Sequence, residues 1–228
     1  MSAGGCSTTA SLRERAGRVY AALAFGRAAA VYGFLTDHPA WRADCRAMAA
    51  LATGPRVLDL GVGPGTSALE MARADPARRH VGLDRSGGML RLAADAARRA
   101  ALRLPLVQAD ALALPLRTGS VDGATAHSLL YLVPDAAAAL REVARVLRPG
   151  GRLVLLEPRA GPASLRSALR RGGRCAASMV MWRSMSRLHR RFAEPELRAL
   201  LEEAGLGEAR AWPVLDGYGV MATASRPG

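Results

Sequence analysis

The sequence has no lysine, few aromatic residues and only three cysteines. All 32 basic residues among the 228 are arginines, which stay charged at any working pH. Without lysine, the Lys-Ser/Thr pair of a phosphate-binding loop is absent. Cys6, Cys45 and Cys175 are far apart and match no Cys/His ligand spacing, so we expect reduced thiols and no metal. Aromatic residues make up 4% of the chain, and packing in the core is their simplest use.

Long apolar runs are also missing. The longest, residues 28–35, is far shorter than the roughly 20 residues that a membrane-spanning helix requires. The first residues lack a basic start followed by an apolar segment, which is the pattern of a secretory signal. We therefore expect a cytoplasmic protein that does not cross a bilayer.

The chain is rich in apolar residues and carries a local excess of positive charge. Half of the residues are hydrophobic and 22% are charged, which is typical of a globular protein. The net charge is +13, and residues 159–191 hold nine arginines and no acidic residue. Because the charge gathers in one segment, the composition differs from that of uniformly basic nucleic-acid binders, and we do not expect a nucleic-acid partner.

From residue 56 onward, short β-branched or leucine-rich runs alternate with longer helical patterns. The expected strands are 56–60, 80–84, 104–109, 121–126 and 152–157, and the expected helices are 66–74, 88–100 and 135–147. This alternation predicts an α/β fold with a Rossmann-like, doubly wound and mostly parallel sheet that has helices on both faces.

The other segments are expected to complete a single domain around this core. We divide it into a helical cap (1–53, with helices at 12–26 and 41–51), the core (54–158), a helical Arg-rich insertion or lid after the fifth strand (159–191), and a C-terminal part (192–228, with a helix at 195–204 and strands near 208–212 and 218–224). The N-terminal helices have no strand partner, so we expect them to cover the carboxyl edge or one face of the sheet.

A glycine-rich turn follows the first strand of the series. Residues 57–66 are VLDLGVGPGT, a strand that leads into a G-x-G-x-G turn and then a helix. Glycines allow backbone conformations that a Cβ forbids and let a ligand lie against the main chain. The spacing differs from the G-x-G-x-x-G of dinucleotide folds, so a pyrophosphate is not the expected ligand.

Acidic residues end the next two strands. Asp84, twenty-five positions after Asp59, is placed to accept hydrogen bonds from two ribose hydroxyls and disfavours a 2′-phosphate by its charge. Asp110 adds a carboxylate where an adenine amino group can be recognised. With the glycine turn, these strand ends predict a site for an adenosyl ligand that has a cationic end.

Five segments carry a wider pattern. They are VLDLGVGPGT (57–66), VGLDRSGGML (81–90), QADALALPL (108–116), SVDGATAHSLLYLVPD (120–135) and LRPGGRLVLLEP (147–158). In order and spacing this set resembles class I S-adenosylmethionine-dependent methyltransferases, most of all the ubiquinone/menaquinone-biosynthesis type of small-molecule methyltransferase. The resemblance implies S-adenosyl-L-methionine as cofactor and S-adenosyl-L-homocysteine as product. One departure is Pro64, which removes an amide donor from the loop.

The resemblance also implies site residues. The cofactor would be bound by Asp59, Gly61, Val62, Gly63, Gly65, Asp84, Arg85, Met89, Asp110, Ala111, His127 and Ser128. In-line methyl transfer needs chiefly alignment and exclusion of water, and it needs a base only if the acceptor must lose a proton. The candidates for a catalytic role are His127, Tyr131, His38 and Tyr32. For His127 we favour a hydrogen-bonding role beside the cofactor, and for the tyrosines packing is the alternative.

The expected acceptor is a small organic molecule, lipophilic or natural-product-like. Residues 127–130 (HSLL) lack the D/N-P-P-aromatic sequence that resembles base amino methyltransferases, and no metal-ligand cluster appears. The alternatives are an RNA or protein methyltransferase recruited by the basic segment, and a cofactor-binding module without turnover.

Three interpretations of the basic segment 159–191 stay open. Met179, Trp182 and Met185 recur at helical spacing beside several arginines. Such a helix can rest on an anionic membrane surface, act as a lid that receives an acidic group of the acceptor, or simply pack on the N-terminal helices. In each case we expect its apolar face and the N-terminal helices to enclose the acceptor.

Overall fold

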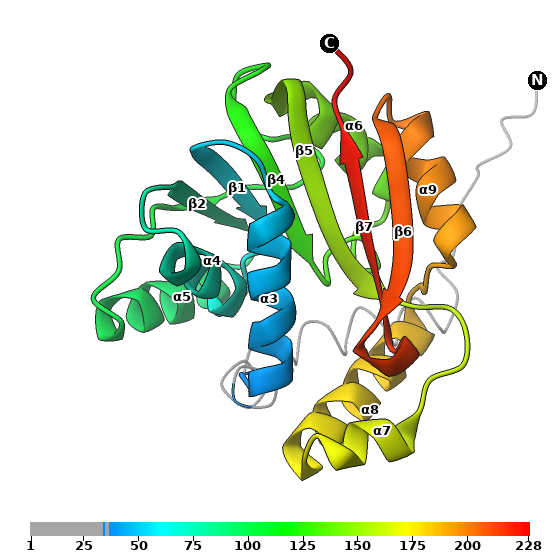
Figure 1. Cartoon of the computed structure of the whole chain (residues 1–228). Coiled ribbons are helices and arrows are strands. Elements are labelled where there is room, and N and C mark those ends of the chain that lie inside the picture. Colours follow the sequence, from blue (N-terminus) through cyan, green and yellow to red (C-terminus); the bar gives the residue numbers. More distant parts are fainter. Residues whose placement is uncertain (1–33, 35–36) are drawn as a thin grey trace, which may run out of the picture.

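The computed structural model describes Phe34 and residues 37–228. A seven-stranded sheet runs through this part of the chain in the order β3-β2-β1-β4-β5-β7-β6 (Figure 1). The strands are β1 (Arg56–Leu60), β2 (Arg79–Asp84), β3 (Leu106–Gln108), β4 (Val121–His127), β5 (Leu147–Pro158), β6 (Gly207–Val214) and β7 (Gly219–Ser225). Strands β1 to β5 are parallel, whereas β7 is antiparallel to β5 and β6. The predicted fold class is confirmed.

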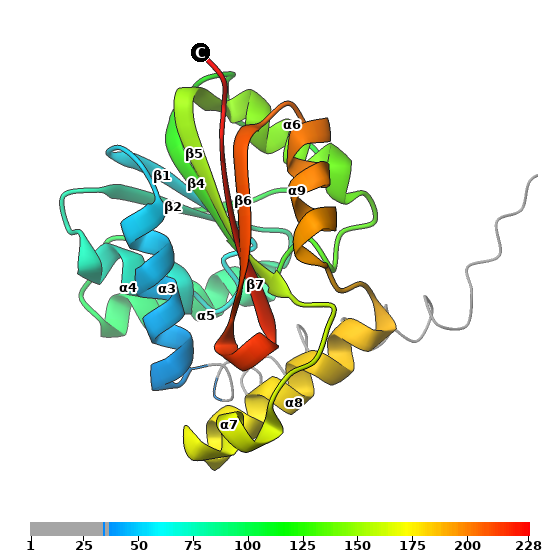
Figure 2. The same cartoon turned by 45° about the vertical axis from the view of Figure 1, so that its right-hand side comes forward.

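Helices cover both faces of this sheet (Figure 2). On one face lie α3 (Pro39–Leu51), α4 (Thr66–Ala74) and α5 (Gly87–Arg99), and on the other lie α6 (Ala136–Val146) and α9 (Glu194–Glu203). Local signals set where these helices begin. Asp135 caps α6 by accepting a hydrogen bond from the Ala138 N–H at 2.8 Å, and Pro39 occupies the first turn of α3, where its missing N–H costs nothing.

The basic segment 159–191 is helical, as predicted. It forms α7 (Leu165–Arg170) and α8 (Gly173–Leu188), which lie beyond the end of β5 (Figure 1). Because β5 is parallel to its central neighbours, this is the carboxyl edge of the sheet. A short 3₁₀ turn, η1 (Leu215–Gly217), joins β6 to β7 and contacts α7. The predicted helix at 12–26 and the candidate Tyr32 lie outside the described residues.

Burial is most complete at the centre of the sheet. All seven residues of β4 are buried, because neighbouring strands and helices cover both of its faces. Strand β5 starts at Leu147, earlier than predicted. The Gly150 N–H donates to the carbonyl of Arg226, and the Arg226 N–H donates to the carbonyl of Gly151. Because of these hydrogen bonds, the residues before 152 extend the strand.

Candidate active site

The turn between β1 and α4 is built on three left-handed glycines. Gly61, Gly63 and Gly65 have φ angles of +66°, +54° and +90°. Side chains rarely permit these angles, so glycine lets the chain turn sharply into α4. A Cβ on Gly65 would approach the backbone of Ala93 in α5 to 3.1 Å. A Cβ on Gly63 would meet only the Gly61 carbonyl, at 3.9 Å, among the described residues, so this part of the loop surface is open to a ligand.

Asp84, at the end of β2, faces this loop. Its Oδ2 accepts a hydrogen bond from the Gly63 N–H at 2.9 Å, and its Oδ1 accepts one from the Ser86 N–H at 2.7 Å. Burial raises the pKa of the Asp84 carboxyl, while these backbone hydrogen bonds lower it. Each carboxylate oxygen has a further lone pair, so Asp84 retains the capacity to accept hydrogen bonds from two neighbouring hydroxyl groups.

Asp59 lies beneath the loop. Its side chain is fully buried, and its two oxygens accept hydrogen bonds from the hydroxyls of Ser67 at 2.6 Å and Thr125 at 2.8 Å. Burial raises the pKa of the Asp59 carboxyl to about 6. Val62 is also buried, and its N–H donates to the carbonyl of Leu83. Both residues thus fix the loop from below, and direct contact with a cofactor stays a prediction for them.

The strand order places the predicted residues in one row. Since β2 lies between β3 and β1, and β1 lies beside β4, the carboxyl edge presents Asp110, Asp84, the glycine loop and His127 in succession. The side-chain amide of Gln108 donates to the carbonyl of Arg85 at 3.1 Å, which joins the ends of β2 and β3.

The predicted adenine-binding residues lie at the rim of this row. Met89 is 1% exposed, and its N–H donates to the hydroxyl of the helix cap Ser86 at 3.3 Å. Ala111 is buried. Asp110 is exposed, and its Oδ1 accepts a hydrogen bond from the Leu112 N–H at 2.9 Å. These positions leave the adenine contacts as predictions.

Beyond the end of β4, four aromatic side chains form a buried group between α3 and α8, which we call the aromatic cluster. The Trp41 ring centroid lies 4.3 Å from that of His127, 5.2 Å from that of Trp182 and 6.1 Å from that of His38. None of the four residues is more than 8% exposed. The cluster brings together two of the predicted catalytic residues and joins α3 to the basic segment.

Three ring nitrogens of the aromatic cluster are buried without a hydrogen-bond partner among the described residues. They are Nε2 of His38, Nε2 of His127 and Nε1 of Trp182. Nδ1 of His127 lies 3.1 Å from the Ser128 hydroxyl. Burial lowers the pKa of His127 to about 3, so its ring is neutral at physiological pH. A neutral ring can form a hydrogen bond with a ligand, but with that pKa it is a weak general base.

Glu157, at the end of β5, is a site residue that the sequence reasoning missed. Its Oε1 accepts backbone hydrogen bonds from Leu129 at 2.9 Å and Leu130 at 2.7 Å, and its Oε2 accepts one from Tyr131 at 3.4 Å. Burial raises the pKa of this carboxyl to about 8. The carboxyl group therefore holds the segment after β4, in which Ser128 has a φ of +61°. An acid at the end of the apolar run RLVLLE was the available signal.

Sequence reasoning also did not place the two tryptophans of the aromatic cluster in the site. Trp182 was expected only in an apolar stripe, and Trp41 only as the start of a helix. The predicted catalytic residue Tyr131 is buried, and its ring packs edge-on against His189 with centroids 5.9 Å apart.

Three further findings concern the described residues: a groove, the lack of a metal-binding cluster and the lack of a membrane-spanning helix. A groove of about 210 Å³ beside α4 and α5 includes Pro64 and Thr66 in its lining but none of the predicted cofactor-binding residues. No group of three or more His, Cys, Asp or Glu side chains in the described part could hold a metal ion. No helix there is long and apolar enough to cross a membrane.

Comparisons with known proteins agree with this geometry. Residues 58–155 match the family model described as a methyltransferase domain. The ubiquinone/menaquinone biosynthesis C-methyltransferase of Syntrophotalea carbinolica is 40% identical over 117 residues, which are 51% of this chain and 49% of that protein. The chain thus spans about half the length of this curated relative.

Solved structures extend the likeness to most of the chain. Phosphoethanolamine N-methyltransferase 2 of Haemonchus contortus, in complex with S-adenosyl-L-methionine, has a TM-score of 0.72 at 14% identity, covering 93% of this chain and 60% of that one. The [4+2]-cyclase SpnF has a TM-score of 0.67 at 20% identity, covering 94% and 96%. Such identities show a shared fold. Residues 58–155 therefore match a methyltransferase domain, and the described chain shares the fold of these solved structures.

Proposed function

We propose that this protein transfers a methyl group from S-adenosyl-L-methionine to a small, largely apolar organic acceptor. The observation that carries the proposal is the row of glycine loop, Asp84 and Asp110 along one sheet edge, directly beside the aromatic cluster. The row offers hydrogen-bond acceptors for an adenosyl group, and we propose that the second molecule binds against the aromatic rings of the cluster. The matching methyltransferase domain supports the same activity.

The residues present fit this cofactor. Asp84 can accept hydrogen bonds from the ribose hydroxyls, while the open backbone at Gly63 leaves room for the ligand beside the loop. Asp110 and Met89 are proposed to bind the adenine edge and face, with Ala111 and Arg85 beside them. Asp59 and Val62 support the loop from below, and Gly61, Gly65 and Ser128 shape the backbone around the ligand.

The cofactor, when bound, supplies a methyl group already activated by a positively charged sulfur. The chain's own contribution is therefore to align the acceptor and exclude water. The neutral His127 ring is proposed to orient the acceptor through Nε2, which has no partner among the described residues. Nε2 of His38 and Nε1 of Trp182, in the same aromatic cluster, also have no partner among the described residues. Glu157 keeps the backbone after β4 in place.

The acceptor is proposed to bind where α3 and α8 meet. Trp41 and Trp182 come from the proposed cap and lid regions and pack edge to face at 5.2 Å over the carboxyl edge. Two large aromatic faces favour a planar or apolar molecule, because stacking adds to the free energy of burial. Quinone precursors are the acceptors suggested by the name of the curated relative.

The test combines two measurements on the purified full chain. Calorimetric titration with S-adenosyl-L-methionine and S-adenosyl-L-homocysteine should give saturable heats. Incubation with methyl-labelled cofactor and a panel of phenols, quinols and aromatic acids should give a labelled product by mass spectrometry. Absence of binding to both compounds would contradict the assignment of the site.

Two alternatives have separate signatures. Binding without transfer to any acceptor would favour a module without turnover or another chemistry, and the likeness to a cyclase shows that the fold alone does not decide the reaction. An RNA or protein methyltransferase recruited by the basic segment should lose activity steeply as salt rises, because charge neutralisation would dominate its binding. A buried apolar acceptor predicts a weak dependence on salt.

A further inference from the structure

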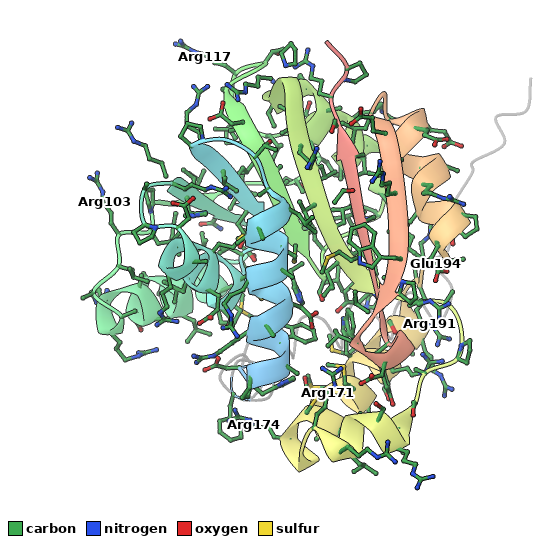
Figure 3. All side chains as sticks on the ribbon, viewed as in Figure 1. Arg103, Arg117, Arg171, Arg174, Arg191 and Glu194 are labelled. Carbon is green, nitrogen blue, oxygen red and sulfur yellow. The ribbon has the colours of Figure 1, made fainter. Side chains whose placement is uncertain are left out.

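A second groove lies at the far end of α8, on the side of the loop that follows β5. Its volume is about 390 Å³, and it is lined by Ala160, Gly161, Arg183, Ser186, Arg187, His189, Arg190 and Arg191. Four of these residues are arginines and none is acidic. In Figure 3, Arg191 lies above and to the right of Arg171 and Arg174, which are at the junction of α7 and α8. We call this feature the arginine groove.

Arg183 is held in a fixed position inside the arginine groove. Its Nη2 donates to the carbonyl of Gly161 at 2.7 Å, and its guanidinium carbon lies 5.8 Å from the centre of the Tyr218 ring. Its Nη1 is buried and has no hydrogen-bond partner among the described residues. A buried, charged donor without an acceptor is costly, and an anion would remove that cost.

Two carboxylates that follow α8 in the chain, Glu194 and Glu196, already have arginine partners. Arg190 donates to Glu196 at 2.6 Å, and the guanidinium of Arg190 lies over the ring of Phe192 at 4.8 Å. Glu194 accepts a hydrogen bond from Arg159 at 2.6 Å. The groove lining itself holds four arginines and no acidic residue, and one of these arginines, Arg190, is ion-paired to Glu196.

The arginine groove and the aromatic cluster share α8. Arg183 follows Trp182 in α8, and Trp182 belongs to the aromatic cluster. At the end of α8, His189 lines the groove and packs against Tyr131, whose N–H is held by Glu157. One molecule with an apolar body and a charged end could thus contact both features.

We propose that the arginine groove binds an anionic group, a carboxylate or a phosphate, on the methyl acceptor. This inference rests on the proposed function, because it assigns the acceptor class to an apolar or aromatic molecule that carries an acid. Arg183 supplies the central donor, and its planar guanidinium suits the two oxygens of such a group. The other arginines of the groove raise the local potential.

The first test uses inorganic phosphate as the probe and does not depend on methyl transfer. Phosphate should raise the melting temperature of the full chain more than chloride does at equal ionic strength, and it should bind with saturation in a calorimetric titration. Arg183→Gln should lower phosphate affinity at least tenfold. The matched control is Arg166→Gln, which removes the same charge from an exposed residue of α7 outside the groove and should bind phosphate like the parent chain.

The second test uses pairs of acceptors that differ only in the acidic group. A carboxylic acid should have a KM at least tenfold lower than its carboxamide, and Arg183→Gln should remove this difference while its affinity for S-adenosyl-L-methionine is unchanged. Arg183→Lys, which keeps the charge but not the fork of donors, should fall between the two. Unchanged cofactor binding also shows that each variant is folded.

The outcomes separate the inference from the proposed function. If phosphate binds equally to the parent chain and Arg183→Gln, or if acid and amide are methylated with the same KM, the inference is wrong even though methyl transfer stands. If neither cofactor nor methyl transfer is detected while phosphate still binds at Arg183, the groove is an anion site and its assignment to a methyl acceptor is wrong.

A lipid headgroup is a second source of the same anion. If the bound acceptor is lipid-borne, vesicles of phosphatidic acid should retain the parent chain and Arg166→Gln equally. They should retain Arg183→Gln less. Equal loss of retention in both variants would show a diffuse surface attraction and contradict a defined groove at the membrane. A soluble aromatic phosphate that binds at Arg183, with no retention on vesicles, would assign the anion to a free molecule.

Discussion

At the scale of single residues, Asp84 combines two tasks. Its carboxylate fixes the glycine loop through Gly63 and faces the proposed ribose position. Asp84→Ala should weaken S-adenosyl-L-methionine binding by about 1 to 3 kcal/mol, because charged hydrogen bonds are lost. Calorimetry measures this change, with Asp95→Ala as the control, since Asp95 is ion-paired to Arg98 outside the site. An unchanged dissociation constant would remove Asp84 from the cofactor site.

A second residue-scale prediction concerns Glu157 and pH. Its pKa is raised from 4.5 to about 8, so the folded chain binds more protons than the unfolded chain between these values, and stability falls as pH rises through them. The described histidines with lowered pKa values, including His127, have the opposite effect: they make stability rise with pH. This effect is confined to pH values below about 6.5, the pKa of an unfolded histidine. The decline from pH 6.5 to 8 therefore belongs mainly to Glu157.

Glu157→Gln mimics the protonated form and should flatten this decline. From pH 6.5 to 8 the parent chain should lose up to about 2 kcal/mol of unfolding free energy, since one pKa unit corresponds to about 1.4 kcal/mol. Urea unfolding at pH 6.5, 7.2 and 8.0 measures both proteins. Parallel curves for the two would show that Glu157 is already ionised in the folded chain.

At the scale of elements, the close packing of α4 and α5 depends on Gly65. An alanine there would adopt a φ of +90° and bring its Cβ within 3.1 Å of the Ala93 backbone. We expect Gly65→Ala to destabilise the fold by about 2 to 4 kcal/mol, because backbone strain and overpacking add. Gly150→Ala is the matched control, since Gly150 has a φ of +74° but a Cβ there would have no neighbour within 4 Å among the described residues.

The comparison of these two variants isolates the packing contribution. Gly150→Ala should cost only the strain of a left-handed residue, about 1 kcal/mol. Thermal or urea unfolding of both variants gives the difference. Equal destabilisation would mean that α5 moves away from α4 without cost and that Gly65 serves the turn alone.

At the scale of the whole molecule, α3 and α8 are joined across the carboxyl edge although 141 positions separate Trp41 from Trp182. A double-mutant cycle with Trp41→Phe and Trp182→Phe should give a coupling free energy of about 0.5 to 1.5 kcal/mol, the range for edge-to-face aromatic pairs. Urea unfolding of the parent, the two single variants and the double variant measures it. Additive effects would show that the two rings only fill space independently.

The same scale explains what the sequence could and could not predict. The bounds of β1 and α4 were predicted to the residue, because the glycines of the loop punctuate the end of one and the start of the other. The row of Asp84 and Asp110 followed from strand ends alone. The aromatic cluster could not be predicted, because its members come from distant segments whose contact depends on how α8 crosses the edge. The partners of Glu157 likewise depend on the pairing of β4 with β5.

The position of β7 in the sheet affects when the sheet can form during synthesis. β7 lies between β5 and β6 although it follows both in the chain, so β6 has no neighbour to pair with until residues 219–225 leave the ribosome. Until then the edge of β5 presents unpaired amides and carbonyls to any other nascent strand. Chaperone protection should matter most during that interval of synthesis.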